Sequence, residues 1–167
     1  MQSSGQTFLR FSKQICMERI GEPWLPGRPY RDRPGVYAII RGESGHLLCV
    51  EQDGELQLPG GGIEPGESPI TALHREVREE TGWTIGGWPG PALRRVGGFQ
   101  RYTWIPEYQM WARKVQAIYL ARAIRPLGPP LEAGHIPLWL EPDVAERSLD
   151  IEGDRVMVAR VRRRGWL

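Results

Sequence analysis

One segment constrains this 167-residue chain more than any other: a cluster of glycines followed directly by an acidic helix. Ser68 is a natural N-cap, and Gly82 suits the position just past a helix end. Between them Ile70, Leu73 and Val77 recur at helical spacing and form one apolar stripe. The segment therefore predicts a helix over residues 68–81, with one face packed onto the rest of the fold.

Three glutamates lie on the C-terminal half of this helix. Glu76 and Glu80 are one turn apart on the same face, and Glu79 lies beside them. Carboxylates this close repel one another, and a hard divalent cation, Mg²⁺ or Mn²⁺, would relieve that repulsion. Arg75 is placed to reach Glu79 at i,i+4. A single such glutamate is most often an exposed helix residue, but the cluster favours a metal site.

Glycines before the helix let the backbone turn sharply and approach a ligand closely. A glycine loop that leads into a helix N-terminus is also a common anion-binding arrangement. The acids lie toward the other end of the helix, so the loop must fold back across the helix if both share one site. The glycines of this loop are Gly60, Gly61, Gly62 and Gly66.

The spacing of the whole segment resembles the Nudix box, G-x5-E-x7-R-E-U-x-E-E-x-G-U, where U is a bulky aliphatic residue. Only the last position departs from it. Trp83 stands there, and we expect altered packing rather than lost chemistry. The fixed positions are filled by Gly61, Glu67, Arg75, Glu76, Val77, Glu79, Glu80 and Gly82. The chain is thus similar to MutT-like Nudix hydrolases.

This resemblance implies an α/β fold of the Nudix type, an α/β/α sandwich around a mixed parallel and antiparallel sheet. Short links between several predicted strands favour a mixed sheet as well. We expect an irregular N-terminal segment over residues 1–34 and a single domain over 35–167. Phe8 to Ile20 fits a strand or a short helix. Strands are further expected over 36–40, 46–50, 55–58, 93–104 and 108–121, and helices over 141–148 and 151–163.

The activity that the resemblance implies is hydrolysis of a pyrophosphate bond in a nucleoside diphosphate linked to another group, with Mg²⁺ or Mn²⁺ as cofactor. By position, Glu76, Glu79 and Glu80 are the metal ligands, and the carbonyl of Gly60 is a further ligand. Arg75 belongs to the same catalytic group. The residues expected to brace the loop and the helix are Gly61, Glu67, Arg75 and Gly82.

The catalytic base is less fixed in this family, where a box glutamate or an acid from a later loop serves. The strand expected over 108–121 contains no acid. Glu107, in the turn before it, is the nearest candidate, although an exposed turn residue is the simpler interpretation. Glu132 and Glu141 are others. If none of these contributes, we expect Glu76 to act as the base.

Substrate specificity is expected outside the box, in the two strands that follow it. Arginine or lysine can bind phosphate there, and an aromatic ring can stack on a base. The alternative, that alternating aromatics are half-buried sheet residues, fits most of them better. The candidates are Arg101, Tyr102, Trp104, Trp111, Arg113 and Lys114. The histidines His46, His74 and His135 show no ligand spacing, and the sequence assigns them no role.

Composition narrows the partners. The net charge of +2 is too near balance to favour nucleic acid, and the arginines at 160 and 162–164 suit a solvated last helical turn. Cys16 and Cys49 lack the spacing of a zinc site, and Cys49 lies in an apolar run. No stretch is apolar enough to span a membrane, so a cytoplasmic location is the expectation.

Three hypotheses about the function of the protein remain open from the sequence alone. The first is a pyrophosphohydrolase that acts on a small nucleotide, with a homodimer as an open option. The second keeps the chemistry but takes the 5′ triphosphate end of RNA as substrate. The third is a Nudix domain that senses a nucleotide without cleaving it. Degenerate box acids would mark the third, and the box is intact.

Overall fold

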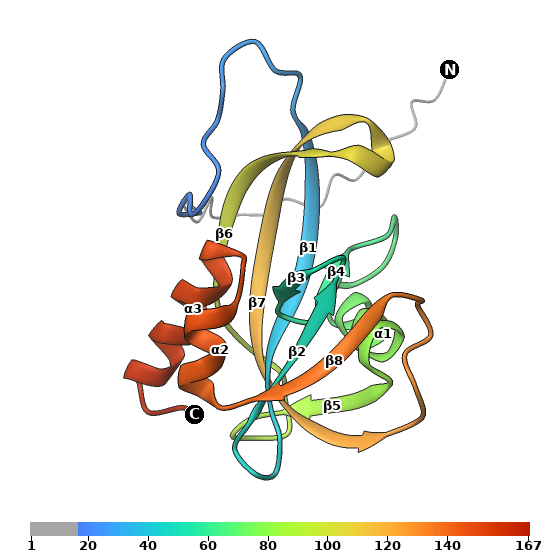
Figure 1. Ribbon diagram of the computed structural model, residues 1–167, viewed down its shortest axis with the longest axis vertical. Coiled ribbons are helices and arrows are strands. Elements are labelled where there is room, and N and C mark those ends of the chain that lie inside the picture. Colours follow the sequence, from blue (N-terminus) through green and yellow to red (C-terminus); the bar gives the residue numbers. More distant parts are fainter. Residues whose placement is uncertain (1–16) are drawn as a thin grey trace, which may run out of the picture.

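The computed structural model describes residues 17–167 and contains an eight-stranded sheet with helices on both faces (Figure 1). At its centre β1 (Arg31–Arg41) and β7 (Met110–Pro126) run parallel and pair over the full length of β1. The other strand pairs of the described chain are antiparallel. The sheet is therefore mixed, which confirms the predicted α/β/α fold class.

The remaining strands extend this central pair. β2 and β4 pair with β1, β3 and β8 pair with β2, and β5 and β6 pair with β7. β6 and β7 form the long hairpin that projects at the top of Figure 1. The bounds are β2 (Leu47–Gln52), β3 (Glu55–Gln57), β4 (Gly60–Gly62), β5 (Trp83–Gly87), β6 (Arg94–Ile105) and β8 (His135–Leu140).

Helices cover both faces of the sheet, with α1 (Pro69–Thr81) on one side and α2 (Pro142–Ser148) and α3 (Glu152–Arg163) on the other (Figure 1). The predicted caps of α1 are confirmed. Ser68 accepts a hydrogen bond from a backbone N–H of the first turn at 3.1 Å, and Gly82 ends the helix in the left-handed conformation, with φ +75°.

Alternation along β1 explains why the sheet needs a helix layer on each face. Val36, Ala38 and Ile40 pack in the cluster that α1 covers, while Tyr37 and Ile39 pack in the cluster under α2 and α3. All five are buried. From residue 35 to residue 40 the central strand therefore has no solvent face, and α1 packs against the sheet through its apolar stripe.

Several boundaries differ from the predictions because strand pairing overrides local sequence preference. β1 begins at Arg31, so residues 31–34 form strand and are not irregular as predicted. Residues 1–16 lie outside the described chain, and with them most of the segment from Phe8 to Ile20 that fitted a strand or a short helix. Gly60–Gly62 is a strand, not a loop. β7 continues to Pro126. The glycine- and proline-containing strands β5 and β8 were not predicted, and their partner strands hold them in register.

Two smaller predictions concern the surface and the core. Arg160 and Arg162 lie in the last turn of α3 and form ion pairs with Glu18 and Glu146. Cys49 is fully buried in the core, as its apolar run indicated. None of the helices in residues 17–167 has the length and apolar character needed to cross a membrane.

Candidate active site

The glycines of β4 bring the strand back across α1. β4 pairs antiparallel with β1 at Gly35–Tyr37, and at Gly60 (φ +141°) a Cβ would lie 2.2 Å from the Val36 carbonyl oxygen. At Gly61 a Cβ would lie 2.4 Å from a carboxylate oxygen of Glu76. Only glycine permits the backbone contact at Gly60, while a side chain at position 61 would displace the Glu76 carboxylate. The strand and the acidic helix therefore share one site, as the sequence required.

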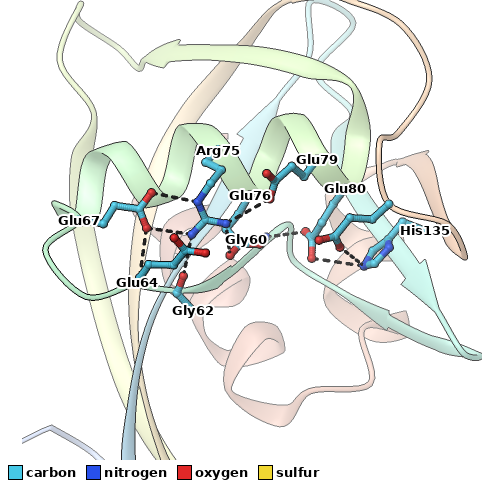
Figure 2. Close-up of polar contacts among 10 residues, drawn as sticks. Gly60, Gly62, Glu64, Glu67, Arg75, Glu76, Glu79, Glu80 and His135 are labelled. Atoms are coloured by element: carbon cyan, nitrogen blue, oxygen red, sulfur yellow. Dashed lines mark hydrogen bonds and ion pairs between the residues drawn. The ribbon is translucent and has the colours of Figure 1, made fainter. Parts of the chain in front are cut away.

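Arg75 binds three of the box carboxylates at once (Figure 2). Its guanidinium donates to Glu67 at 2.8 and 2.9 Å, to Glu76 at 2.8 Å and to Glu79 at 3.1 Å. A further bond to the Gly62 carbonyl, at 3.0 Å, ties the same arginine to β4. The hydrogen bond from Arg75 holds the pKa of Glu67 below its usual value. Arg75 thus fixes the helix, the loop and the strand together.

Glu80 is held differently. Its Oε2 accepts the N–H of Gly60 at 2.8 Å, and the residue is only 5% exposed. Burial and, to a smaller extent, the carboxylates of Glu76, Glu132 and Glu79 together raise the pKa of Glu80 to about 8, although the Gly60 hydrogen bond opposes the shift. Among the described residues, no arginine or lysine forms an ion pair with it. Its negative charge is therefore uncompensated by a permanent cation.

Two residues that follow β7, Glu132 and His135, lie near the free side of Glu80, and Figure 2 labels His135 there. The backbone N–H groups of Leu131 and Glu132 donate to the Glu79 carbonyl at 2.7 and 3.1 Å, which ties this loop to the end of α1. His135, the first residue of β8, places its Nε2 at 3.6 Å from Glu80 Oε1 and 3.5 Å from Glu132 Oε2. The sequence named Glu132 as one of several candidates and gave His135 no role.

This donor set fits a divalent cation. Carboxylate oxygens are the ligands that Mg²⁺ and Mn²⁺ prefer. Burial raises the pKa of Glu76 even though Arg75 opposes the shift, so two carboxylates of the cluster lack full compensation. A cation held by Glu76, Glu79 and Glu80 would supply the missing positive charge.

A polar cavity of about 210 Å³ opens beside Glu80. The glycines of β4 and Glu80 form one side, and Arg33 of β1 and Lys114 of β7 also line it. Burial, together with the nearby positive charges of Arg101 and Arg33, lowers the pKa of Lys114 to about 8. The cavity therefore joins an acidic wall to a basic one. Its amide and aromatic lining includes Gln52, Gln57, Gln116, Tyr37 and Tyr108.

Of the predicted substrate-binding residues, Lys114 is the one that lines this cavity. Arg101 is buried and engaged by Glu22 at 2.7 Å and by Gln116 at 3.2 Å. The others lie along the β6–β7 hairpin: Tyr102 against Tyr30, Trp104 against Trp111, and Arg113 beside Asp32. These side chains support the half-buried sheet interpretation more than a direct contact with substrate.

Sequence reasoning missed Arg33 and Tyr108, which lie at the cavity on neighbouring elements. The Arg33 guanidinium stacks over the Tyr108 ring at 4.7 Å from its centroid. Glu107 lies in the short 3-10 helix η1 (Pro106–Tyr108), is exposed, and has no ion pair or hydrogen bond with the box acids in the described chain. Glu141 is exposed at the start of α2.

A mixed sheet between helix layers, with a glycine strand folded against an acidic helix, defines a Nudix-type domain. The chain belongs to this family, because the family model described as NUDIX domain matches residues 31–161. Among solved structures, the fold is similar to a MutT protein from Methanosarcina mazei Go1 (TM-score 0.61, 23% identity, covering 82% of this chain and 97% of that one). It is also similar to a MutT NUDIX hydrolase from Burkholderia pseudomallei (TM-score 0.62, 22% identity, 78% and 98%). At these identities the likeness concerns the fold alone.

Curated relatives match over a shorter stretch. An RNA pyrophosphohydrolase from Halorhodospira halophila is 44% identical over 52 residues, which cover 30% of this chain and 29% of the relative. A nucleoside triphosphatase NudI from Escherichia coli is 43% identical over 58 residues, 31% of this chain and 41% of the relative. The chain thus aligns with less than half of each relative. Both relatives are named as hydrolytic enzymes, one for RNA and one for nucleoside triphosphates.

Proposed function

We propose that this protein hydrolyses a pyrophosphate bond in a nucleoside diphosphate linked to another group, with Mg²⁺ or Mn²⁺ as cofactor. One observation carries the proposal: the cavity in which Glu80 and the β4 glycines share a lining with Arg33 and Lys114. A diphosphate needs cations around its charge and a place for a metal ion, and this cavity offers both. The complete set of box acids argues against a purely sensing role.

Different residues at the site would bind the phosphate and the cation. Arg33 and Lys114 would bind phosphate oxygens from the basic side of the cavity. Glu76, Glu79 and Glu80, with the Gly60 carbonyl, would hold the cation, which when bound polarises the phosphate and lowers the pKa of a water molecule. Arg75 keeps two of these carboxylates in place through its bonds at 2.8 and 3.1 Å.

Glu76 is the proposed catalytic base. Its carboxylate packs directly against the Gly61 backbone, which lines the cavity, so it lies close to where a water molecule could attack a bound diphosphate. Glu107 would have to move inward from an exposed turn to serve, because it is exposed in η1.

A small nucleotide fits this site better than a polymer. The cavity of about 210 Å³ is below the range of roughly 300–1,000 Å³ typical of pockets that enclose a whole drug-sized ligand. It therefore suits the diphosphate and a neighbouring group, with the base lying outside. Tyr108 is 61% exposed at the cavity lining and offers a ring for that base.

RNA with a 5′ triphosphate is the second candidate, because one relative carries the name RNA pyrophosphohydrolase. The basic C-terminal residues give it little support, because Arg160 pairs with Glu18 and Arg162 with Glu146. A long anionic polymer would need a wider basic surface.

A substrate panel tests the proposal and ranks the candidates. The protein is incubated with ADP-ribose, a dinucleoside polyphosphate, a noncanonical nucleoside triphosphate and a triphosphorylated RNA oligonucleotide, each with Mg²⁺ or Mn²⁺, and with EDTA as control. We expect metal-dependent cleavage within the diphosphate of at least one small nucleotide, identified from its products by mass spectrometry. Cleavage of the RNA alone would move the assignment to the second candidate. Nucleotide binding without cleavage of any compound would replace hydrolysis with sensing.

A further inference from the structure

We propose that His135 is a further ligand of the cation that Glu80 binds, so that one nitrogen, with a carboxylate oxygen of Glu132 beside it, joins the oxygen ligands proposed above, and that this site prefers Mn²⁺, Co²⁺ or Zn²⁺ to Mg²⁺. The inference deepens the proposed function by naming the class of metal. It rests on that function only for its role in hydrolysis, because metal binding is measured without substrate.

The spacing of the three donor atoms suits a shared ion. His135 Nε2 lies 3.6 Å from Glu80 Oε1 and 3.5 Å from Glu132 Oε2, and one ligand atom from each residue lies within 4.8 Å of the others. These separations exceed the 2.7–3.2 Å of N–H···O hydrogen bonds. Ligands about 2.1 Å from an ion in tetrahedral geometry lie roughly 3.4 Å apart. The imidazole is therefore too far for direct hydrogen bonds and correctly spaced for coordination.

Burial of His135 provides a second, independent observation. Its side chain is only 4% exposed, and its Nδ1 is buried without a hydrogen-bond partner among the described residues. Buried polar groups are almost always satisfied, so an imidazole buried among carboxylates needs an explanation. Its Nε2 faces Glu80 Oε1 (Figure 2) and Glu132 Oε2 across gaps longer than a hydrogen bond, and coordination through Nε2 would give this nitrogen a partner and orient the ring.

Each donor is fixed by contacts that do not involve an ion. Gly60 holds the other oxygen of Glu80 at 2.8 Å, which turns Oε1 toward His135. The Glu79 carbonyl accepts the N–H of Glu132 at 3.1 Å and keeps that residue at the end of α1. His135 is held in β8 by pairing with Gln52 of β2. The three donors thus come from three separately anchored elements, so little ordering is needed when a cation binds.

The nitrogen ligand decides the metal preference. Mg²⁺ takes oxygen ligands and keeps several of its water molecules, so an imidazole adds little to its binding. Imidazole nitrogen binds Co²⁺ and Zn²⁺ well and Mn²⁺ less strongly, because the affinity of a nitrogen site for divalent ions rises from Mn²⁺ to the later transition metals. Removing His135 should therefore weaken binding of these ions far more than binding of Mg²⁺.

A protonated His135 that acts as an internal cation between the two carboxylates is the competing explanation. In that case the ring would compensate Glu80 and Glu132 and would compete with a metal ion. Loss of the ring would then strengthen the binding of every divalent cation. The two explanations predict opposite signs for the same substitution.

The test measures metal binding to the full-length protein without nucleotide. Mn²⁺, Co²⁺ and Mg²⁺ are titrated into wild type, His135→Gln and the control His74→Gln, whose histidine is exposed on α1. We expect His135→Gln to weaken Co²⁺ and Mn²⁺ binding by about 10- to 100-fold and Mg²⁺ binding by less than about threefold. The control should match wild type. Equal losses for all three ions, unchanged binding or tighter binding would each overturn the proposal.

Pulsed electron paramagnetic resonance of bound Mn²⁺ keeps the proposal testable if His135→Gln does not fold. We expect a nitrogen coupling in wild type and in His74→Gln, and absence of nitrogen coupling in wild type would overturn the assignment. Failure of the nucleotide panel together with this nitrogen signal would remove the hydrolase function but leave the metal site. Hydrolysis of a nucleotide without the nitrogen signal would keep the hydrolase function and overturn the assignment of His135 as a ligand.

Discussion

The two ends of the acidic site handle negative charge in different ways. At one end, Arg75 binds Glu67, Glu76 and Glu79 through hydrogen bonds of 2.8–3.1 Å. At the other end, Glu80 is buried without an arginine or lysine partner among the described residues, and its pKa is raised to about 8. The chain thus carries its own cation where it needs rigidity.

That difference shows where the fold leaves room for an external ion. Carboxylates already bound to a guanidinium stiffen the site, while a buried carboxylate without a cation costs stability until one arrives. The cavity and His135 both lie at the uncompensated end. Predictions that alter one end at a time can therefore separate chemistry from architecture.

The largest effect should come from Glu80→Gln. In the wild type the Glu80 carboxylate accepts the Gly60 N–H at 2.8 Å. The amide oxygen of Gln can accept the same N–H, but the amide is neutral and a poor metal ligand. We expect kcat to fall by about 10³-fold, with metal affinity falling in parallel. Steady-state kinetics and calorimetric metal titration check both quantities.

The metal-free stability of the same variant should change in the opposite direction. Glu80 has a folded pKa raised above the unfolded value, so its charged form opposes folding increasingly as pH rises from about 4.5 toward 8. A neutral Gln removes that cost, and Tm at pH 7.5 in EDTA should rise. If activity stayed at the wild-type level, the assignment of Glu80 as a ligand would be wrong.

Arg75→Lys should have the next largest effect, because it disturbs the compensated end. A lysine keeps the charge but cannot bind three carboxylates and the Gly62 carbonyl at once. We expect a roughly 100-fold loss of kcat/KM and a loss of about 1–2 kcal/mol in the free energy of unfolding. Arg78→Lys, at an exposed position of the same helix, is the control. Equal behaviour of the two variants would show that Arg75 does not organise the site.

The same comparison separates what the sequence could predict from what it could not. Contacts within α1 follow from helical spacing, so the Arg75–Glu79 pair was predicted and is confirmed at 3.1 Å. The partners of Glu80 depend on tertiary structure. Glu132 is placed by a bond to the Glu79 carbonyl, and His135 by the pairing of β8 with β2. Neither contact leaves a signal at fixed spacing.

The fold shows the same division between local and distant causes. The helix caps at Ser68 and Gly82 could be predicted from the sequence because capping depends on adjacent residues. β5 and β8 contain glycine or proline, and their strand state depends on hydrogen bonds from β7 and β2. For the same reason Arg33 was not recognised as a cavity residue, since only the parallel pairing of β1 with β7 brings it beside Lys114.

Lys114→Gln should affect binding more than turnover. Loss of one charge-assisted contact to phosphate should raise KM roughly tenfold and leave kcat within about threefold. The ammonium form, which binds phosphate, predominates below the lowered pKa of about 8 and is lost as pH rises above it. The kcat/KM of wild type should therefore fall above pH 8, and this fall should be reduced in Lys114→Arg. An unchanged KM in the Gln variant would place the substrate elsewhere.

Ser68→Ala should have the smallest effect on activity and thereby tests whether the compensated end is only a scaffold. The Ser68 side chain accepts the Thr71 N–H at 3.1 Å, far along the helix from Glu80. Losing this cap should cost about 1 kcal/mol of stability and lower Tm by roughly 2–4 °C. Ser148→Ala, at the end of α2, is the matched control. We expect kcat/KM at 25 °C to stay within about twofold, because Arg75 still holds the carboxylates when the first turn frays. A large loss of activity in the folded variant would mean that order at the helix start reaches Glu80, and the two ends would then form one cooperative unit.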